Sequence, residues 1–166
     1  MLLAYLIIAL VALQRAAELI YAERNTRALL ARGAVEAGRK HYPLMVALHA
    51  AWLAATAVFL PDTPQIQWIA LTAFIVLQAL RVWVIATLGP YWTTRIVTLP
   101  GAPLVKKGPY KFVRHPNYMI VIGEVMALPL VFGEAAVALV FTALNAAMLY
   151  WRIKAEEAAL APRRDA

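Results

Sequence analysis

The sequence contains no cysteine among its 166 residues. Disulfide bonds, thiolate metal sites and a cysteine nucleophile are therefore excluded. Histidine is also rare, with only His41, His49 and His115 present. Three scattered histidines without any cysteine make poor zinc ligands, so we expect no bound metal.

Charged side chains are scarce as well. They make up 15% of the residues, whereas a soluble domain typically carries about a quarter. Hydrophobic residues reach 63%, and a surface of this composition cannot all face water. The length allows one domain, which we place over residues 1–166. The composition therefore predicts a single, all-helical integral membrane domain.

Apolar runs long enough to cross a bilayer recur along the chain, since about 20 mostly apolar residues span the hydrocarbon core. The chain is apolar from Met1 without the basic lead of a signal peptide, so we expect a retained first helix. Gly133 and Glu134 leave only a tight turn between the last two runs, which predicts an antiparallel helical hairpin. The five expected transmembrane helices are residues 2–22, 44–60, 66–88, 118–132 and 135–151, and we expect the last to continue as a C-terminal helical extension through Glu156 and Glu157.

Basic residues are missing from every second loop. The expected loops 61–65 and 133–134 have none, whereas the loops after residues 22 and 88 and the C-terminal tail carry several. This alternation follows the positive-inside rule and predicts the N-terminus outside and the C-terminus in the cytoplasm. It also accounts for the net charge of +7, so we expect membrane lipids as partners and no nucleic acid.

The longest expected loop, residues 89–117, has an unusual composition. Its 29 residues hold five prolines and three glycines, too many for a helix. A loop of this length in a compact domain is usually functional. Segments 95–99 and 103–106 flank Pro100 and Gly101, which predicts a short β-hairpin inside the loop.

Ionisable side chains occur inside the expected spans, where they are costly and generally mark a functional site. Arg15 and Glu18 admit two interpretations, a structural ion pair or part of a site. Arg81 lies near the cytoplasmic end, from which a long side chain can extend to the headgroups. A lone His49 is more often an interior histidine than a ligand. Because most such groups lie in the cytoplasmic half, we predict a polar pocket there, roofed by the long loop.

Two short elements carry the strongest functional signal. One runs from Gly108 to Tyr118 with the sequence GPYKFVRHPNY, and the other from Arg152 to Glu157 with the sequence RIKAEE. The first resembles the G-x-Y-x-x-x-R-H-P-x-Y signature of isoprenylcysteine carboxyl methyltransferases and related phospholipid N-methyltransferases. The second is similar to that family's arginine followed by two glutamates. As in the family, one helical hairpin separates the two elements.

This resemblance implies an integral membrane methyltransferase that takes S-adenosyl-L-methionine from the cytosol and a lipophilic substrate from the bilayer. The cofactor's carboxylate suits cationic side chains, its amine and ribose hydroxyls suit a carboxylate, and its sulfonium suits an aromatic face. The cofactor-binding residues expected from the two elements are Gly108, Pro109, Tyr110, Arg114, His115, Pro116, Tyr118, Glu156 and Glu157. Asn145 is added because helical spacing places it on the same face as Arg152 and Glu156.

The acceptor stays open between a carboxylate and a hydroxyl, and we favour methylation of oxygen over nitrogen. A carboxylate needs a cation to hold it, for which Arg152 or Arg81 could serve. A phenolic or enolic hydroxyl needs a base, and His49, His115 or Glu124 could act. The expected catalytic residues are therefore Arg152, Glu124 and His49.

Two other functions are alternatives. The first is a membrane-embedded NADPH-dependent reductase of the sterol type, whose C-terminal helices are thought to be similar and which also lacks a G-x-G-x-x-G fingerprint. The second is a non-enzymatic membrane scaffold, which would not need Arg114, His115, Arg152 and Glu156 together. The sequence leaves the oligomeric state open.

Overall fold

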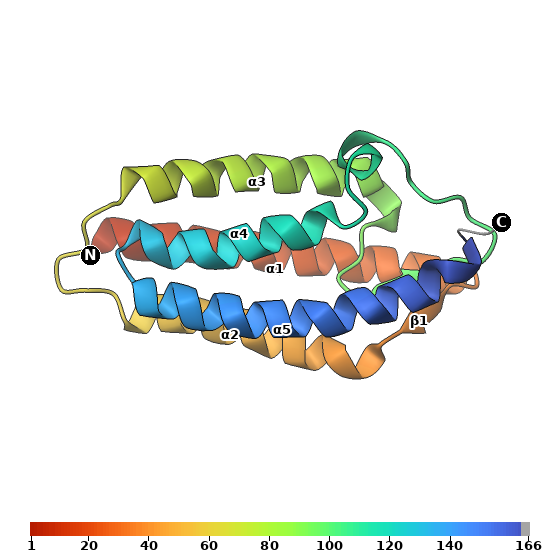
Figure 1. The fold of residues 1–166 in the computed structure, drawn as a ribbon, viewed down its shortest axis with the longest axis horizontal. Helices are drawn as coiled ribbons and strands as arrows, with labels where there is room; N and C mark the ends of the chain where they lie inside the picture. Colours follow the sequence, from red (N-terminus) through yellow and green to blue (C-terminus); the bar gives the residue numbers. More distant parts are fainter. Residues whose placement is uncertain (164–166) are drawn as a thin grey trace.

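The computed structural model describes residues 1–163 as a bundle of five α-helices that run along the long axis of the molecule (Figure 1). Residues 164–166 of the expected domain lie outside the described part. By length and composition, four helices can cross a membrane and α4 is a shorter apolar helix. The helical membrane bundle is thus confirmed, with four full-length spans in place of the five expected. The helices are α1 (Leu2–Ala31), α2 (Tyr42–Val58), α3 (Trp68–Leu88), α4 (Pro116–Val131) and α5 (Ala135–Leu160).

Two helices extend well past their apolar runs. Helix α1 continues to Ala31 and ends before Gly33, whose φ of 88° suits glycine. Helix α5 continues to Leu160, as the predicted C-terminal extension requires. Both extensions are rich in alanine, leucine, arginine and glutamate, which are strong helix formers in water as well as in lipid. Hydropathy alone therefore placed these two ends too early.

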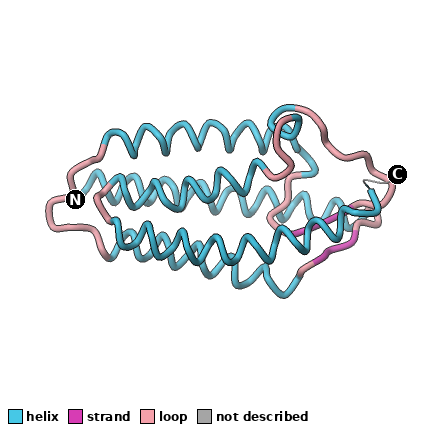
Figure 2. The backbone as a smooth tube through the Cα atoms, viewed as in Figure 1, coloured by secondary structure: helices cyan, strands magenta, loops and turns pink. Residues whose placement is uncertain are grey.

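The long loop contributes one strand of a two-stranded sheet. Strand β2 (Ile96–Thr98) pairs antiparallel with β1 (Val35–Ala37), which follows α1 (Figure 2). The predicted hairpin between segments 95–99 and 103–106 is therefore wrong. Its turn forms, because Ala102 N donates to Leu99 O at 3.2 Å. Pro103 then lacks the N–H that a second strand would need, and β1 supplies the pairing instead.

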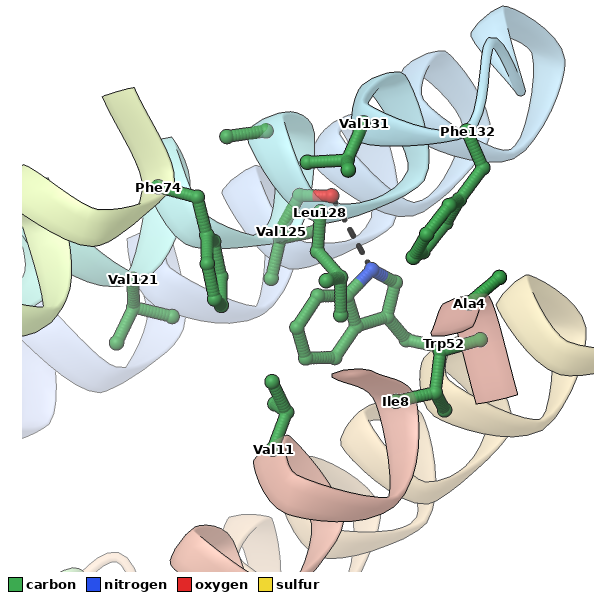
Figure 3. Close-up of a cluster of buried hydrophobic side chains, with 11 residues drawn as sticks. Ala4, Ile8, Val11, Trp52, Phe74, Val121, Val125, Leu128, Val131 and Phe132 are labelled. Carbon is green, nitrogen blue, oxygen red and sulfur yellow. Dashed lines mark hydrogen bonds between the residues drawn. The ribbon is translucent and has the colours of Figure 1, made fainter. Parts of the chain in front are cut away.

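One end of the bundle is filled by apolar side chains, and we call it the packed half. Trp52 of α2 is 1% exposed at its centre, and its indole N–H donates to Val125 O at 3.1 Å (Figure 3). The α4–α5 turn also lies at this end (Figure 1). The other buried members of the cluster are Ala4, Ile8, Val11, Phe74, Val121, Ala127, Leu128, Val131 and Phe132.

Helix α4 is held closely between its neighbours. A Cβ atom on Gly123 would lie 2.9 Å from Leu77 Cδ1, so this glycine allows α3 and α4 to approach. Gly133, with a φ of 82°, and Glu134 form the turn to α5. The predicted antiparallel hairpin of the last two helices is confirmed, and it carries the two motif elements at its open end.

The opposite end holds the sheet, the long loop and the end of α5, and we call it the hollow half (Figure 2). The start of the loop is tied to α1, because Asn25 Nδ2 donates to Gly89 O at 3.1 Å and to Trp92 O at 2.9 Å. The N-terminus lies at the packed end and α5 ends at the hollow end (Figure 1). The orientation of these ends across a membrane stays a prediction.

Candidate functional site

A cavity of about 890 Å³ occupies the hollow half. All five helices line it, and residues 91–115 contribute much of its wall, so the predicted pocket beside the long loop is present, although its lining is mainly apolar and not polar as expected. It gathers most of the expected site residues from distant parts of the chain. Those that line it are His49, Tyr110, Arg114, His115, Tyr118, Arg152 and Glu156.

The two motif elements meet at one wall of this cavity. The Tyr118 hydroxyl donates to Glu156 Oε2 at 2.6 Å, and His115 Nδ1 lies 3.4 Å from the same oxygen. The His115 ring stacks on the Tyr118 ring, with centroids 5.5 Å apart. His115 Nε2 is also 3.6 Å from Glu157 Oε1. The second element thus orients the aromatic residues of the first.

Two ring groups of the first element keep their protons more firmly than usual. The hydrogen bond to Glu156 raises the pKa of His115 above its usual value, although burial acts against it. Burial, helped by the charge of Glu156, raises the pKa of the Tyr110 hydroxyl well above its usual range. Tyr110 is therefore a neutral phenol at physiological pH, and His115 favours the imidazolium form.

Three small or rigid residues of the first element shape the backbone and do not line the cavity. Gly108 has a φ of 55°, and a Cβ atom there would lie 2.6 Å from Thr87 Oγ1, so the loop can touch α3 only with glycine. Pro109 follows it and is buried. Pro116 is the first residue of α4, where its fixed φ suits the start of a helix. These residues place the Tyr110, His115 and Tyr118 side chains.

Two polar groups on this wall have no internal partner. Arg114 is exposed and lines the cavity, and within residues 1–163 its guanidinium makes no hydrogen bond or ion pair. Asn117 also lines the cavity, and its Oδ1 is buried without a hydrogen-bond partner in the described chain. Buried polar atoms are normally satisfied, so a ligand that fills this space would find a free cation and a free acceptor.

Arg152 holds the loop over the cavity. Its side chain is buried, and Nη2 donates to Thr94 O at 2.9 Å, while Nε has no partner within residues 1–163. Asn145 lies elsewhere, because the cavity lining on α5 begins at Leu149, about one helical turn after Asn145 in the sequence. The Asn145 amide is 1% exposed and unpartnered within the described residues. The structure therefore does not bring Asn145 to the wall with the other expected cofactor residues.

Four charged side chains form a closed ring at the inner end of the cavity. Arg15 lies 3.0 Å from Glu18 and 3.0 Å from Glu124, whose residues belong to α1 and α4. Arg81 of α3 lies 2.6 Å from Glu18 and 3.0 Å from Glu124. We call these residues the charge ring. Its two positive and two negative groups alternate, so the ring is neutral as a whole.

The charge ring corrects the prediction for Arg81, and it combines the two interpretations of Arg15 and Glu18. Arg81 does not extend toward the headgroups, because it is 6% exposed and all three guanidinium nitrogens contact Glu18 or Glu124. Arg15 and Glu18 are a structural pair and also line the cavity. Glu124 is 1% exposed and lies outside the cavity lining. Two acids and two arginines on three apolar helices were the sequence signal for this ring.

His49 lies on the same cavity, on α2. Its Nδ1 is 2.9 Å from Met45 O, and a ring nitrogen that bonds to a carbonyl must carry the proton. The neutral ring therefore has an unprotonated Nε2. Its edge meets Trp52 at a centroid distance of 6.3 Å, which holds the imidazole at the border of the packed half.

The sequence did not show which contacts hold the long loop, residues 89–117, over the cavity. Arg95, beside β2, lies 3.3 Å from Glu36 and 3.5 Å from Glu23, and its guanidinium covers the Tyr42 ring at 4.6 Å. Thr94 also donates to the Tyr42 hydroxyl at 3.3 Å. These contacts join the roof to the α1–α2 connection.

Comparisons with known proteins agree with the two motif elements. A family model described as the isoprenylcysteine carboxyl methyltransferase (ICMT) family matches residues 68–162. An uncharacterized protein of Bacillus subtilis, YpbQ, is 39% identical over 160 residues, which cover 94% of this chain and 95% of that protein. An uncharacterized protein of Haemophilus influenzae is 32% identical over 143 residues, or 82% of this chain and 83% of that protein. No solved structure matches.

Proposed function

The chain belongs to the isoprenylcysteine carboxyl methyltransferase family, and on that premise we propose that it methylates a lipophilic acceptor with S-adenosyl-L-methionine. The acceptor atom in this proposal is an oxygen, of a carboxylate or a hydroxyl. One observation carries it: the Tyr118–Glu156 hydrogen bond of 2.6 Å joins the two motif elements at one cavity. Family membership is the basis for the choice of cofactor.

The wall formed by the motif elements fits that cofactor chemically. S-adenosylmethionine, when bound, supplies a methyl group on a cationic sulfur. Arg114 is a free cation for its carboxylate, and Glu156 or Glu157 is an acceptor for its amine or ribose hydroxyls. Tyr110 and Tyr118 offer ring faces that attract a cation by about 0.5–2 kcal/mol. Most of these side chains are held by neighbours, so they bind without first having to be ordered.

The inner end of the cavity fits the acceptor. Among the three candidate bases, His49 alone presents an unprotonated nitrogen to the cavity with no charged partner on it. Glu124 is paired with both Arg15 and Arg81 at 3.0 Å and lies outside the cavity lining. His115 is engaged with Glu156. We therefore assign removal of a hydroxyl proton to His49, and to Glu124 the placing of the two arginines.

The same ring bears on the kind of acceptor. Arg81 cannot hold an acceptor carboxylate without giving up Glu18 or Glu124, so Arg152 is the remaining candidate through its unpartnered Nε. A buried anion needs a full ionic partner. Arg152 has no carboxylate partner within residues 1–163, so the proposal keeps both acceptors: a carboxylate held by Arg152, or a hydroxyl deprotonated by His49. We propose that the cofactor enters from the cytoplasmic side, where α5 ends, and the acceptor from the bilayer.

Calorimetry on detergent-purified protein tests the function. S-adenosylmethionine and S-adenosylhomocysteine should bind with micromolar affinity, and Glu156→Ala should abolish this binding because it removes the acceptor shared by His115 and Tyr118. Asp62→Ala, which removes an exposed acid at the opposite end, is the control and should bind normally. NADPH binding tighter than that of S-adenosylmethionine would point to the reductase, and no binding by folded protein would reject the proposal.

A further inference from the structure

The cavity reaches the outer surface of the bundle between α1 and α2. Ala12 and Ala16 of α1 and Ala50 of α2 line the cavity and are nevertheless exposed. Leu53 and Val46 of α2 line it beside them and are partly exposed. Because both helices are candidate membrane spans, this opening faces hydrocarbon when the protein lies in a bilayer. An apolar chain in the membrane can therefore reach the cavity at this place.

A second depression, of about 590 Å³, lies between α1 and α3 and is a competing route. It is separated from the cavity by polar contacts, since Glu18 lines both spaces. Gln78 donates a hydrogen bond to Gln14 at 3.0 Å, and Arg81 donates hydrogen bonds to both carboxylate oxygens of Glu18 at 2.6–2.9 Å. To part α1 from α3, these bonds must break in a medium that offers no water to replace them.

The interface between α1 and α2, which we call the seam, has no such polar contacts within residues 1–163. Within residues 1–163, no side-chain hydrogen bond or ion pair joins the two helices. Lipid tails are as apolar as the side chains along this seam, so contacts between α1 and α2 can be exchanged for contacts with lipid at little cost. Of the two routes, the one between α1 and α2 is therefore the one that can open.

We propose that the gap between α1 and α2 is the port through which the hydrocarbon tail of the acceptor enters and in which it stays during the reaction. This inference rests on the proposed function, whose acceptor is lipophilic. The three alanines leave room for the tail in the mouth of the port. At its inner end stand His49 and Arg15, so the polar head of the acceptor arrives beside the unprotonated Nε2.

Photolabelling of membrane-reconstituted protein tests the port without knowledge of the natural acceptor. The probe is a fatty acid with a diazirine near the end of its chain, and the readout is label on Leu149. Leu149 lines the cavity and is 5% exposed, so lipid on the outer surface does not reach it. Since the chain has no cysteine, no thiol competes for the activated probe.

Neighbouring alanines supply matched controls. Ala16→Phe and Ala50→Phe fill the port, and each should lower the label on Leu149 by at least about tenfold. Ala17 lines the depression between α1 and α3, and Ala51 is exposed outside the cavity. Ala17→Phe and Ala51→Phe add the same ring on the same helices and should leave the label unchanged.

Three results would overturn the port. They are an unlabelled Leu149 in the native protein, unchanged label in Ala16→Phe and Ala50→Phe, and loss of label in Ala17→Phe alone, which would move the route to α1 and α3. Binding of S-adenosylmethionine to each variant is measured in parallel by calorimetry. Label that follows the expected pattern in protein that never binds the cofactor would keep the port and reject the proposed function.

Discussion

The two halves of the bundle treat buried polar groups in opposite ways. In the apolar cluster at the centre of the packed half, the indole N–H of Trp52 is satisfied by Val125 O, and Glu134, whose buried oxygens have no partner within residues 1–163, lies at the edge of this half in the α4–α5 turn. In the hollow half, four charges are balanced against one another, and several polar atoms beside the cavity have no partner within residues 1–163. Both halves are built from the same five helices. The difference therefore comes from the side chains, together with the sheet and the long loop at the hollow end.

This contrast suggests that residues important for stability and residues important for ligand binding lie at opposite ends of the bundle. The packed half joins α1, α2, α3 and α4 around one indole ring and needs no charge to do so. The hollow half places a cavity where those helices would otherwise touch, and the charge ring keeps α1, α3 and α4 together there. Substitutions in the packed half should change unfolding without changing binding, and those at the motif wall should do the reverse.

Breaking the charge ring should have the largest effect. Arg81→Met leaves Glu18 and Glu124 with only Arg15 between them, and removing one partner of a buried ion pair costs about 3–5 kcal/mol. We expect a loss of this size when unfolding in mixed detergent and SDS micelles is followed by circular dichroism. Arg81→Met combined with Glu124→Gln restores neutrality and should recover part of the loss. Native stability in the single variant would show that the ring is dispensable.

A change at the centre of the packed half should come next. Trp52→Phe removes the hydrogen bond to Val125 O and alters the shape of a filled core, which costs about 1–3 kcal/mol. The same SDS titration measures this loss. The affinity of the folded variant for S-adenosylmethionine should equal that of the native protein. A weaker affinity would mean that the two halves are coupled.

The matching change at the motif wall is Tyr118→Phe. It removes only the hydroxyl that donates to Glu156 at 2.6 Å, and a hydrogen bond to a charged group contributes about 1.5–3 kcal/mol. Calorimetry should therefore show affinity for S-adenosylmethionine weakened by about tenfold or more. Unfolding should change less than in Trp52→Phe. Equal affinity with lowered stability would assign Tyr118 to the fold instead of the site.

The smallest effect concerns pH, and it comes from Glu134 at the packed end and His115 at the hollow end, which both bind their protons more tightly when folded. Burial raises the pKa of Glu134, in the packed end, from 4.5 to about 7. The free energy of unfolding should therefore fall as the pH rises from 4.5 to about 7. The raised pKa of His115 adds stability that is complete below pH 6.5 and is lost as the pH rises through its folded pKa.

Two variants separate these contributions. Glu134→Gln should flatten the dependence on the acid side, and His115→Gln should flatten it above pH 6.5. Both are read from unfolding titrations in a series of buffers. A profile that keeps its slope in both variants would assign the pH dependence to other groups.

Much of the fold could be predicted because its signals are local. Apolar runs of about 20 residues identify helices wherever they occur, and Gly133 with Glu134 identifies the final hairpin. The pairing of β1 with β2 could not be predicted in the same way, since the strands are three residues each and lie far apart in the sequence. A turn at Pro100 and Gly101 was visible, but a turn does not show which strand will pair.

The site residues that belong to a motif could be predicted from the sequence. Residues whose contacts depend on how each helix is rotated about its axis could not. Arg15, Glu18, Arg81 and Glu124 were each visible as charges in apolar runs. That both arginines would share one Glu124 oxygen depends on how α1, α3 and α4 are turned toward one another. Spacing along a helix placed Asn145 with Arg152, but spacing does not show how deep the cavity extends.

The shortness of α4 has a consequence for the bilayer itself. Its 16 residues rise about 24 Å, whereas the hydrocarbon core is about 30 Å thick. A helix too short for its membrane is accommodated by local thinning of the lipid or by polar residues that extend to the interface. Without such thinning, and with the α4–α5 turn at the opposite surface, the motif at its first turn, from His115 to Tyr118, lies below the level of the surrounding headgroups. At that depth, the water-soluble cofactor and the hydrocarbon-soluble acceptor that we propose can meet without either leaving its own solvent.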